Sequence, residues 1–167
     1  MPRRNSRRGI TLLEMLIVLA LIGLMASVVF PAATSALEGL RLRSSADSVA
    51  SLLARSALRV ERKQQPVEIV IDAGQGKLSV VGARAEDREE LQLDAGIRIA
   101  GVEPRLSAEP GEEEDQPEER RFVLTPGSGW PAIRIELANA RNARRAVRLD
   151  PITGAPEVRI PGQEEQP

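Results

Sequence analysis

The chain has 167 residues, a formal net charge of −1 and 42% hydrophobic residues, which allows one domain of modest size. It contains no cysteine and no histidine, which excludes a disulfide framework, the usual zinc sites and histidine-based catalysis. Without the four arginines of residues 1–9 the side chains would sum to −5, and a negative chain gives no general reason to expect nucleic-acid binding. We therefore expect a non-enzymatic protein that needs neither a metal nor another cofactor.

A basic leader meets a long apolar segment at the N-terminus. Residues 1–9 contain four arginines and no acid, and they end at Gly9. Between Ile10 and Ala33 the only ionisable side chain is Glu14. A charge at membrane depth costs roughly 2.5–3.5 kcal/mol on insertion scales, so it is rarely there without a partner. Cleavage after Gly9 would expose a new α-amine on Ile10, where it could pair with Glu14.

This junction resembles the class III signal of type IV pilins and type II secretion pseudopilins, and the resemblance is carried by Gly9-Ile10-Thr11-Leu12-Leu13-Glu14-Met15-Leu16-Ile17-Val18-Leu19. It implies cleavage between Gly9 and Ile10 by a prepilin peptidase, methylation of the new amine, and a filament in which Glu14 meets an α-amine. The implied partners are other major and minor pseudopilins, an inner-membrane assembly platform and secreted proteins. The family usually begins its mature chain with phenylalanine, where this chain has Ile10. Pro31 lies where the family often has a helix-loosening proline, so we expect a kink there.

Three other interpretations of the same residues stay open. A Sec signal peptide would be cleaved at Thr34-Ser35-Ala36 and would leave a β-rich binding module that starts near Leu37. A twin-arginine signal is partly imitated by Ser6-Arg7-Arg8-Gly9-Ile10. A plain single-span anchor is long enough but leaves Glu14 unexplained. Positive charge before the span favours a single-pass inner-membrane protein with its C-terminal domain in the periplasm.

Helical spacing continues beyond Pro31. We expect one helix from about Ile10 to Gln64, with a transmembrane or assembly part at 10–33 and an amphipathic part at 34–65. The alternative is two helices broken at Pro31. Pro66 ends the helix in either case, because the residue before a proline disfavours the α region. The expected apolar stripe consists of Leu37, Leu40, Ala46, Val49, Leu53, Ala57 and Val60.

From residue 66 to 160 the apolar period changes to two, which predicts a β-rich domain. Val67–Ile71 and Lys77–Val81 flank a glycine-bearing turn and predict a hairpin. We also interpret Gly127-Ser128-Gly129 as a hairpin turn. Such strands need a helix to cover one face, so the expected class is α+β, with the long helix packed on antiparallel sheets in a pilin-like fold. The other expected strands are Ile97–Val102, Phe122–Thr125, Ala132–Leu137, Ala146–Leu149 and Glu157–Ile160.

The order of these predicted elements indicates one class within the family that the chain resembles. A long helix with the arginine-containing stretch Ser51–Ala57, a proline turn into Val67–Asp72 and a late Asp150-Pro151-Ile152-Thr153-Gly154 pattern look like the H class of minor pseudopilins. That class implies a position near the tip of a short periplasmic filament that drives type II secretion. A type IV minor pilin for pilus assembly, adhesion or DNA uptake shares this outline and is the main alternative.

Two charged segments mark the second half of the chain. Residues 103–120 include the run Glu109–Glu119, which has no apolar residue to bury and repels itself, so we expect a disordered, solvated loop. Partner docking and a calcium site are the other interpretations of this loop. The residues at 161–167 are expected to form a flexible tail.

The basic cluster consists of Arg141, Arg144, Arg145 and Arg148. It would contact DNA phosphates if the protein served DNA uptake, although no aromatic residue interleaves it.

Overall fold

The computed structural model describes residues 11–84, 87–104 and 119–162, and the backbone alone at positions 28 and 31–33. The predicted leader at 1–9 with Gly9, the following Ile10, most of the acidic loop and most of the tail lie outside the described residues. The chain divides after Leu37 into two compact units. The elements are α1 (Leu12–Lys63), β1 (Val67–Asp72), β2 (Lys77–Val81), β3 (Glu89–Gln92), β4 (Ile97–Glu103), β5 (Glu119–Leu124), β6 (Arg134–Asn139), β7 (Arg144–Leu149) and β8 (Pro156–Arg159).

Helix α1 is continuous through position 31 and ends where the sequence predicts. This confirms one helix over the described range, and it contradicts the alternative of two helices broken at Pro31. A kink at Pro31 stays a prediction. After Lys63, Gln64 has φ 50° and its N–H donates to the oxygen of Val60 at 2.9 Å, which closes the last turn. Pro66 follows, so the helix cannot resume before β1.

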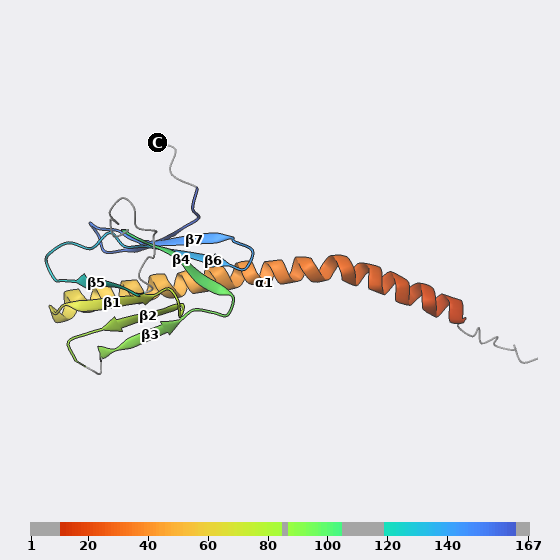
Figure 1. Ribbon diagram of the computed structural model, residues 1–167, viewed down its shortest axis with the longest axis horizontal. Helices are drawn as coiled ribbons and strands as arrows, with labels where there is room; N and C mark the ends of the chain where they lie inside the picture. The colour runs from red at the N-terminus through yellow and green to blue at the C-terminus, as the bar shows by residue number, and fades with distance from the viewer. Residues whose placement is uncertain (1–10, 85–86, 105–118, 163–167) are drawn as a thin grey trace, which may run out of the picture. The chain divides into compact units, whose positions relative to one another are not determined.

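The strands form two antiparallel sheets beside the second half of α1 (Figure 1). Sheet A has the order β3-β2-β1-β5, and sheet B has the order β4-β6-β7-β8. The predicted hairpin is confirmed, since β1 pairs with β2 from Glu68↔Val81 to Asp72↔Lys77. The connection between these strands is tied by the Asp72 carboxylate, which accepts the N–H of Gln75 at 2.8 Å. The predicted α+β class, with a long helix packed on antiparallel sheets, is confirmed.

The core lies between α1 and the inner faces of the two sheets. Val49, Leu53 and Val60 of the predicted stripe are fully buried. The stripe is wrong at its start, because Leu37 and Leu40 are 54% and 62% exposed. The first buried apolar side chain of the second unit is Leu42, which is 3% exposed. The strands, together with Ile133 just before β6, contribute an aliphatic inner layer that includes Ile69, Ile71, Leu78, Leu124, Ile135, Leu137 and Leu149.

Two predictions about the connections need correction, and one strand is missing from the sequence predictions. Gly127-Ser128-Gly129 is not a hairpin turn, because β5 belongs to sheet A and β6 to sheet B, so this connection crosses between the sheets. The predicted loop at 103–120 begins and ends in strand, since β4 ends at Glu103 and β5 begins at Glu119. The sequence does not predict β3, because Glu89–Gln92 has three polar residues out of four and is held by backbone pairing with β2.

Candidate functional site

Helix α1 begins with a hydrogen-bonded cap that contains the predicted assembly carboxylate. The Oγ1 of Thr11 accepts the N–H of Glu14 at 3.2 Å, and the carbonyl of Thr11 accepts the N–H of Met15. Thr11 is therefore the N-cap residue and Glu14 occupies the third helical position, where these residue types are favoured. Glu14 is exposed in the first turn, where the partial positive charge of the helix N-terminus stabilises a carboxylate.

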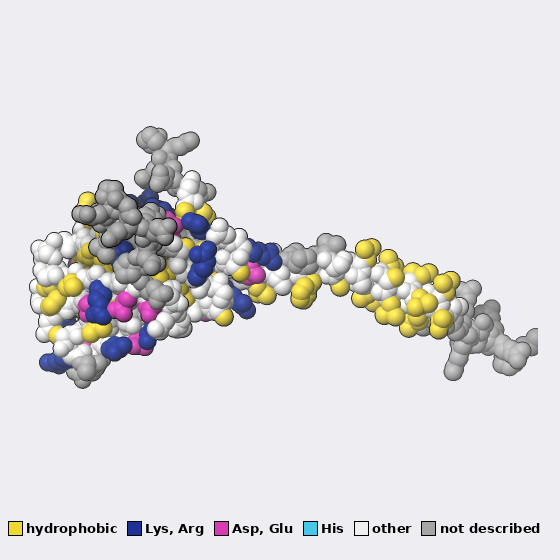
Figure 2. Space-filling model, in the orientation of Figure 1, with side chains coloured by type: hydrophobic (Ala, Val, Ile, Leu, Met, Phe, Trp, Pro, Cys, Tyr) yellow, Lys and Arg dark blue, Asp and Glu magenta, His cyan; other side chains and the backbone are white. Residues whose placement is uncertain are grey.

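The first unit exposes apolar side chains around the whole helix. Figure 2 shows hydrophobic side chains gathered along this half of α1. Leu12 and Phe30 at its two ends are 82% and 73% exposed, and Leu19 between them is 64% exposed. A helix that is apolar all round needs an apolar environment or partner, since surfaces of this size are not normally left in water. Across the described residues, none of the helices combines the length and the apolar character required to cross a membrane.

The four arginines of the predicted basic cluster do not form one surface. Arg141 lies in the turn between β6 and β7, and its Nε is 2.9 Å from Oε2 of Glu38 on α1. Arg144 and Arg148 lie on the outer face of sheet B, where Nη1 of Arg144 is 3.6 Å from Oε2 of Glu136. Arg145 falls on the opposite face of the same strand, with Val147 and Leu149, and is half-buried.

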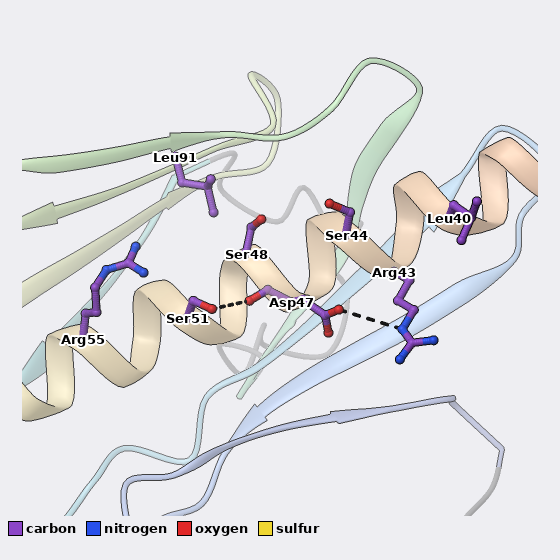
Figure 3. Close-up of a pocket in the computed structure, with 8 residues that line it drawn as sticks. All are labelled: Leu40, Arg43, Ser44, Asp47, Ser48, Ser51, Arg55 and Leu91. Atoms are coloured by element: carbon purple, nitrogen blue, oxygen red, sulfur yellow. Dashed lines mark hydrogen bonds and ion pairs between the residues drawn. The ribbon is translucent and has the colours of Figure 1, made fainter.

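An open groove of about 710 Å³ runs along the exposed side of α1 in the second unit (Figure 3). Ser51 donates its hydroxyl to the carbonyl of Asp47 at 2.8 Å, and Nε of Arg43 is 3.9 Å from the Asp47 carboxylate. Among the residues that the structure describes, no group of three or more acids could hold a metal ion. The groove is lined by Leu40, Arg43, Ser44, Asp47, Ser48, Ser51, Arg55 and Leu91. The lining therefore combines charged, hydroxyl and leucine side chains.

Charged contacts fasten the end of α1 to sheet A, and the sequence does not single them out. Nζ of Lys63 is 2.6 Å from Oδ1 of Asp87, and this hydrogen bond lowers the pKa of Asp87. Arg59 donates to the carbonyl of Asp87 at 2.8 Å. The Glu89 carboxylate contacts both Arg55, at 2.5 Å, and Arg59, at 3.3 Å. In the sequence, the row of basic residues beside the apolar stripe is a sign of these contacts. Their acidic partners cannot be identified from it, because they lie 24 to 34 residues further along the chain.

A second set of contacts holds the connection between β7 and β8. Oδ1 of Asp150 accepts the N–H groups of Thr153, at 2.7 Å, and Ile152, at 2.9 Å. These hydrogen bonds lower the pKa of Asp150, and the charge of Arg148 adds to the effect. The Thr153 hydroxyl also lies 3.1 Å from the same oxygen. The segment at 150–154 is therefore a hydrogen-bonded turn at the end of sheet B.

Comparisons with known proteins agree with the predicted resemblance. A family model described as the prokaryotic N-terminal methylation motif matches residues 4–30. Type II secretion system protein H of Xanthomonas campestris pv. campestris is 33% identical over 99 residues, which are 59% of this chain and 57% of that protein. The chain therefore matches a little over half the length of this relative. The structure of the minor pseudopilin EpsH from the type 2 secretion system of Vibrio cholerae is similar, with a TM-score of 0.53 and 14% identity over 74% of this chain and 99% of that one.

These findings confirm three sequence predictions. The chain carries the N-terminal methylation motif, it resembles the H class of minor pseudopilins, and it has a pilin-like α+β fold. The residues proposed for processing and assembly, Gly9, Ile10 and Glu14, lie within the matched motif.

Proposed function

We propose that this protein is a non-enzymatic minor pseudopilin of a type II secretion system. It is anchored in the inner membrane by its N-terminal helix, with its sheets in the periplasm, and it assembles near the tip of a short filament that helps to export folded proteins. One observation carries the proposal. Glu14 is the only ionisable side chain between Ile10 and Ala33, and it sits in the capped first turn of an apolar helix.

Processing would create the partner that Glu14 needs. Cleavage after Gly9 by a prepilin peptidase would leave the α-amine of Ile10 four residues before Glu14 in the sequence. N-methylation keeps that amine positively charged. The amine of the same or an adjacent subunit can then pair with Glu14, which avoids the roughly 2.5–3.5 kcal/mol cost of an unpaired charge at membrane depth.

The two units of the chain would contribute differently to assembly. The exposed apolar part of α1, from Leu12 to Phe30, packs laterally against the same part of other major and minor pseudopilins. One face of the amphipathic part of α1 is buried in a core that it shares with both sheets. That domain would contact neighbouring subunits, the assembly platform or secreted proteins through the outer faces of the sheets and the groove of Figure 3.

Substitution of Glu14 tests the proposal in native membranes. We expect Glu14→Leu to be cleaved after Gly9 but to be lost from cross-linked complexes with other pseudopilins, and secretion of a reporter protein to fall with it. Glu14→Gln should fail in the same way, because it keeps the size of the side chain and removes the charge. Glu61→Leu is the matched control, since Glu61 is an exposed acid on the same helix. Normal assembly and secretion with Glu14→Leu would contradict the proposal.

A further inference from the structure

The outer face of sheet B has an excess of positive charge. Its outward residues alternate with buried ones such as Ile99, Leu137 and Val147, which point into the core. The outer face of sheet A has the opposite balance, so the excess belongs to one sheet and not to the chain as a whole. The charged residues on the outer face of sheet B are the bases Arg98, Arg134, Arg144, Arg148 and Arg159 and the acids Glu103, Glu136 and Glu157. Those on the outer face of sheet A are the acids Glu68, Asp72, Glu90 and Glu119 and the bases Lys77 and Arg121.

The acids of sheet B neutralise only one part of its outer face. Glu136 is shared between two arginines, since its carboxylate is 3.0 Å from Arg134 and 3.6 Å from Arg144. Glu157 pairs with Arg159 at 2.7 Å. In the row of residues nearest the turn between β6 and β7, the described strands place no acid on this face.

That row contains an arginine pair, Arg98 and Arg144, on the two sides of Ala138. The register sets each arginine opposite Ala138, so their Cα atoms are separated by two strand spacings, or roughly 10 Å. Ala138 contributes only a methyl group, so no long side chain of β6 stands between the two arginines at this position. Nη2 of Arg98 donates to Oδ1 of Asn142 at 3.2 Å, and among the described residues no carboxylate pairs with Arg98. Both arginines are exposed.

An arginine pair of this kind suits an anion from another molecule. A guanidinium group offers a planar set of N–H donors that matches a carboxylate or a phosphate. The three glutamates on the same face repel a chain of phosphates that runs across it, but they leave the arginine pair open to single carboxylates. The outward residues of the described strands of sheet B include no aromatic side chain on which nucleic-acid bases could stack. The face therefore favours the carboxylates of a protein over the phosphates of a nucleic acid.

We infer that Arg98 and Arg144 form a docking site for an acidic surface of a partner protein. A glutamate or aspartate of the partner enters between the two arginines above Ala138 and accepts hydrogen bonds from them. Complementary charge of this kind speeds association and selects the partner. The inference deepens the proposed function and rests on it for the identity of the partner, which is a neighbouring subunit or a secreted protein.

The test measures binding of a fluorescent oligoglutamate peptide to the full-length protein in mild detergent, by fluorescence anisotropy at low salt. We expect the double variant Arg98→Gln with Arg144→Gln to bind the peptide about tenfold more weakly or worse, because both charged donors are lost. The unchanged protein should not bind an oligoglutamine peptide of the same length. Equal binding of the peptide by the double variant and the unchanged protein would overturn the inference.

The matched control removes two other arginines from the same face. Arg148→Gln with Arg159→Gln lowers the net charge by the same amount but leaves the arginine pair in place. We expect it to weaken binding by less than about threefold, since it acts only through the general charge of the face. Equal weakening by the two double variants would show that the peptide responds to net charge and not to a site.

Two further measurements distinguish other occupants of this face. Duplex DNA, added at the same concentration of negative charge, should displace less labelled peptide than unlabelled oligoglutamate does. Equal or stronger displacement by DNA would overturn the inference in favour of phosphate. Sedimentation of the protein alone tests a second copy as the occupant, and self-association that disappears in the Arg98→Gln and Arg144→Gln double variant would also overturn it.

The Glu14→Leu variant separates this inference from the proposed function. It should bind the peptide as tightly as the unchanged protein does, because Glu14 lies in the first turn of α1 and not on sheet B. If the unchanged protein does not bind the peptide, the docking site is wrong and the proposed role of Glu14 stands. If Glu14→Leu assembles normally, the proposed function is wrong and the measured affinity for the peptide is unaffected.

Discussion

Gly154 gives a sharp test of the packing at the end of sheet B. It lies in the turn between β7 and β8 with φ +69°, and its N–H donates to the carbonyl of Asp150 at 2.9 Å. A Cβ at this position would lie 2.5 Å from Cε2 and 2.6 Å from Nε1 of Trp130. Gly154→Ala therefore combines backbone strain with a collision against the indole ring.

The magnitude follows from these two contributions. An L-residue in the left-handed region costs roughly 1–2 kcal/mol. Overpacking against a ring that cannot move freely adds roughly 1–3 kcal/mol, so the expected loss of unfolding free energy is about 2–5 kcal/mol. Gly127 is the matched control, because it has φ +73° and no atom within 4 Å of an added Cβ. Gly127→Ala should cost only the backbone contribution.

Urea unfolding of the full-length protein in mild detergent measures both variants. Trp130 is the only tryptophan, so its fluorescence reports on this site, and circular dichroism reports on the whole β-rich domain. We expect Gly154→Ala to be the less stable variant by about 1–3 kcal/mol. Replacement of Trp130 by leucine should reduce the cost of Gly154→Ala. Equal stability of the two alanine variants would refute the argument from the indole contact.

Two further predictions concern the core and the acid stability of the β-rich domain. Leu53→Ala should lower the unfolding free energy by about 2–5 kcal/mol because its side chain is fully buried, whereas Leu58→Ala, from a side chain that is 52% exposed, should change it by no more than about 0.5 kcal/mol. Similar losses in urea unfolding would contradict the assignment of the buried face. Asp150 has a lowered pKa in the folded state, so its contribution to stability is present above the unfolded pKa near 3.8 and is lost as the pH falls through the folded value. Asp150→Asn should therefore flatten the decline of the urea midpoint below about pH 4, and an unchanged decline would show that the turn does not depend on this carboxylate.

Much of the fold can be predicted from local patterns. The change of apolar period from helical spacing to alternation correctly places the end of α1 before Pro66 and the hairpin from Val67 to Val81. These features depend on residues that are neighbours in the sequence. They also depend on proline and glycine, which end helices and form turns. The contacts of β5 and β6 depend on distant partners, so adjacency in sequence wrongly suggested that they pair across Gly127.

For the candidate site too, the sequence predicts local motifs but not contacts between distant residues. Gly9, Ile10 and Glu14 are predicted from one contiguous motif, and their roles stay predictions. The arginines at 141–148 look like one cluster in the sequence, but the alternation of β7 and the ion pair of Arg141 with Glu38 separate them. The burial of Arg120 could have been anticipated, because alternation from Leu124 and Phe122 places it on the inner face. Its charge argued against that position. The structure resolves the conflict in favour of the alternation.

Processing of the chain before assembly through its N-terminal helix can be checked by the mass of its N-terminal residue. The protein should be purified from native membranes and its N-terminal peptide sequenced by mass spectrometry. We expect a mature chain that begins at Ile10 and carries one additional methyl group on its α-amine. A chain that begins near Leu37, or one that retains Met1 and the basic leader, would contradict it.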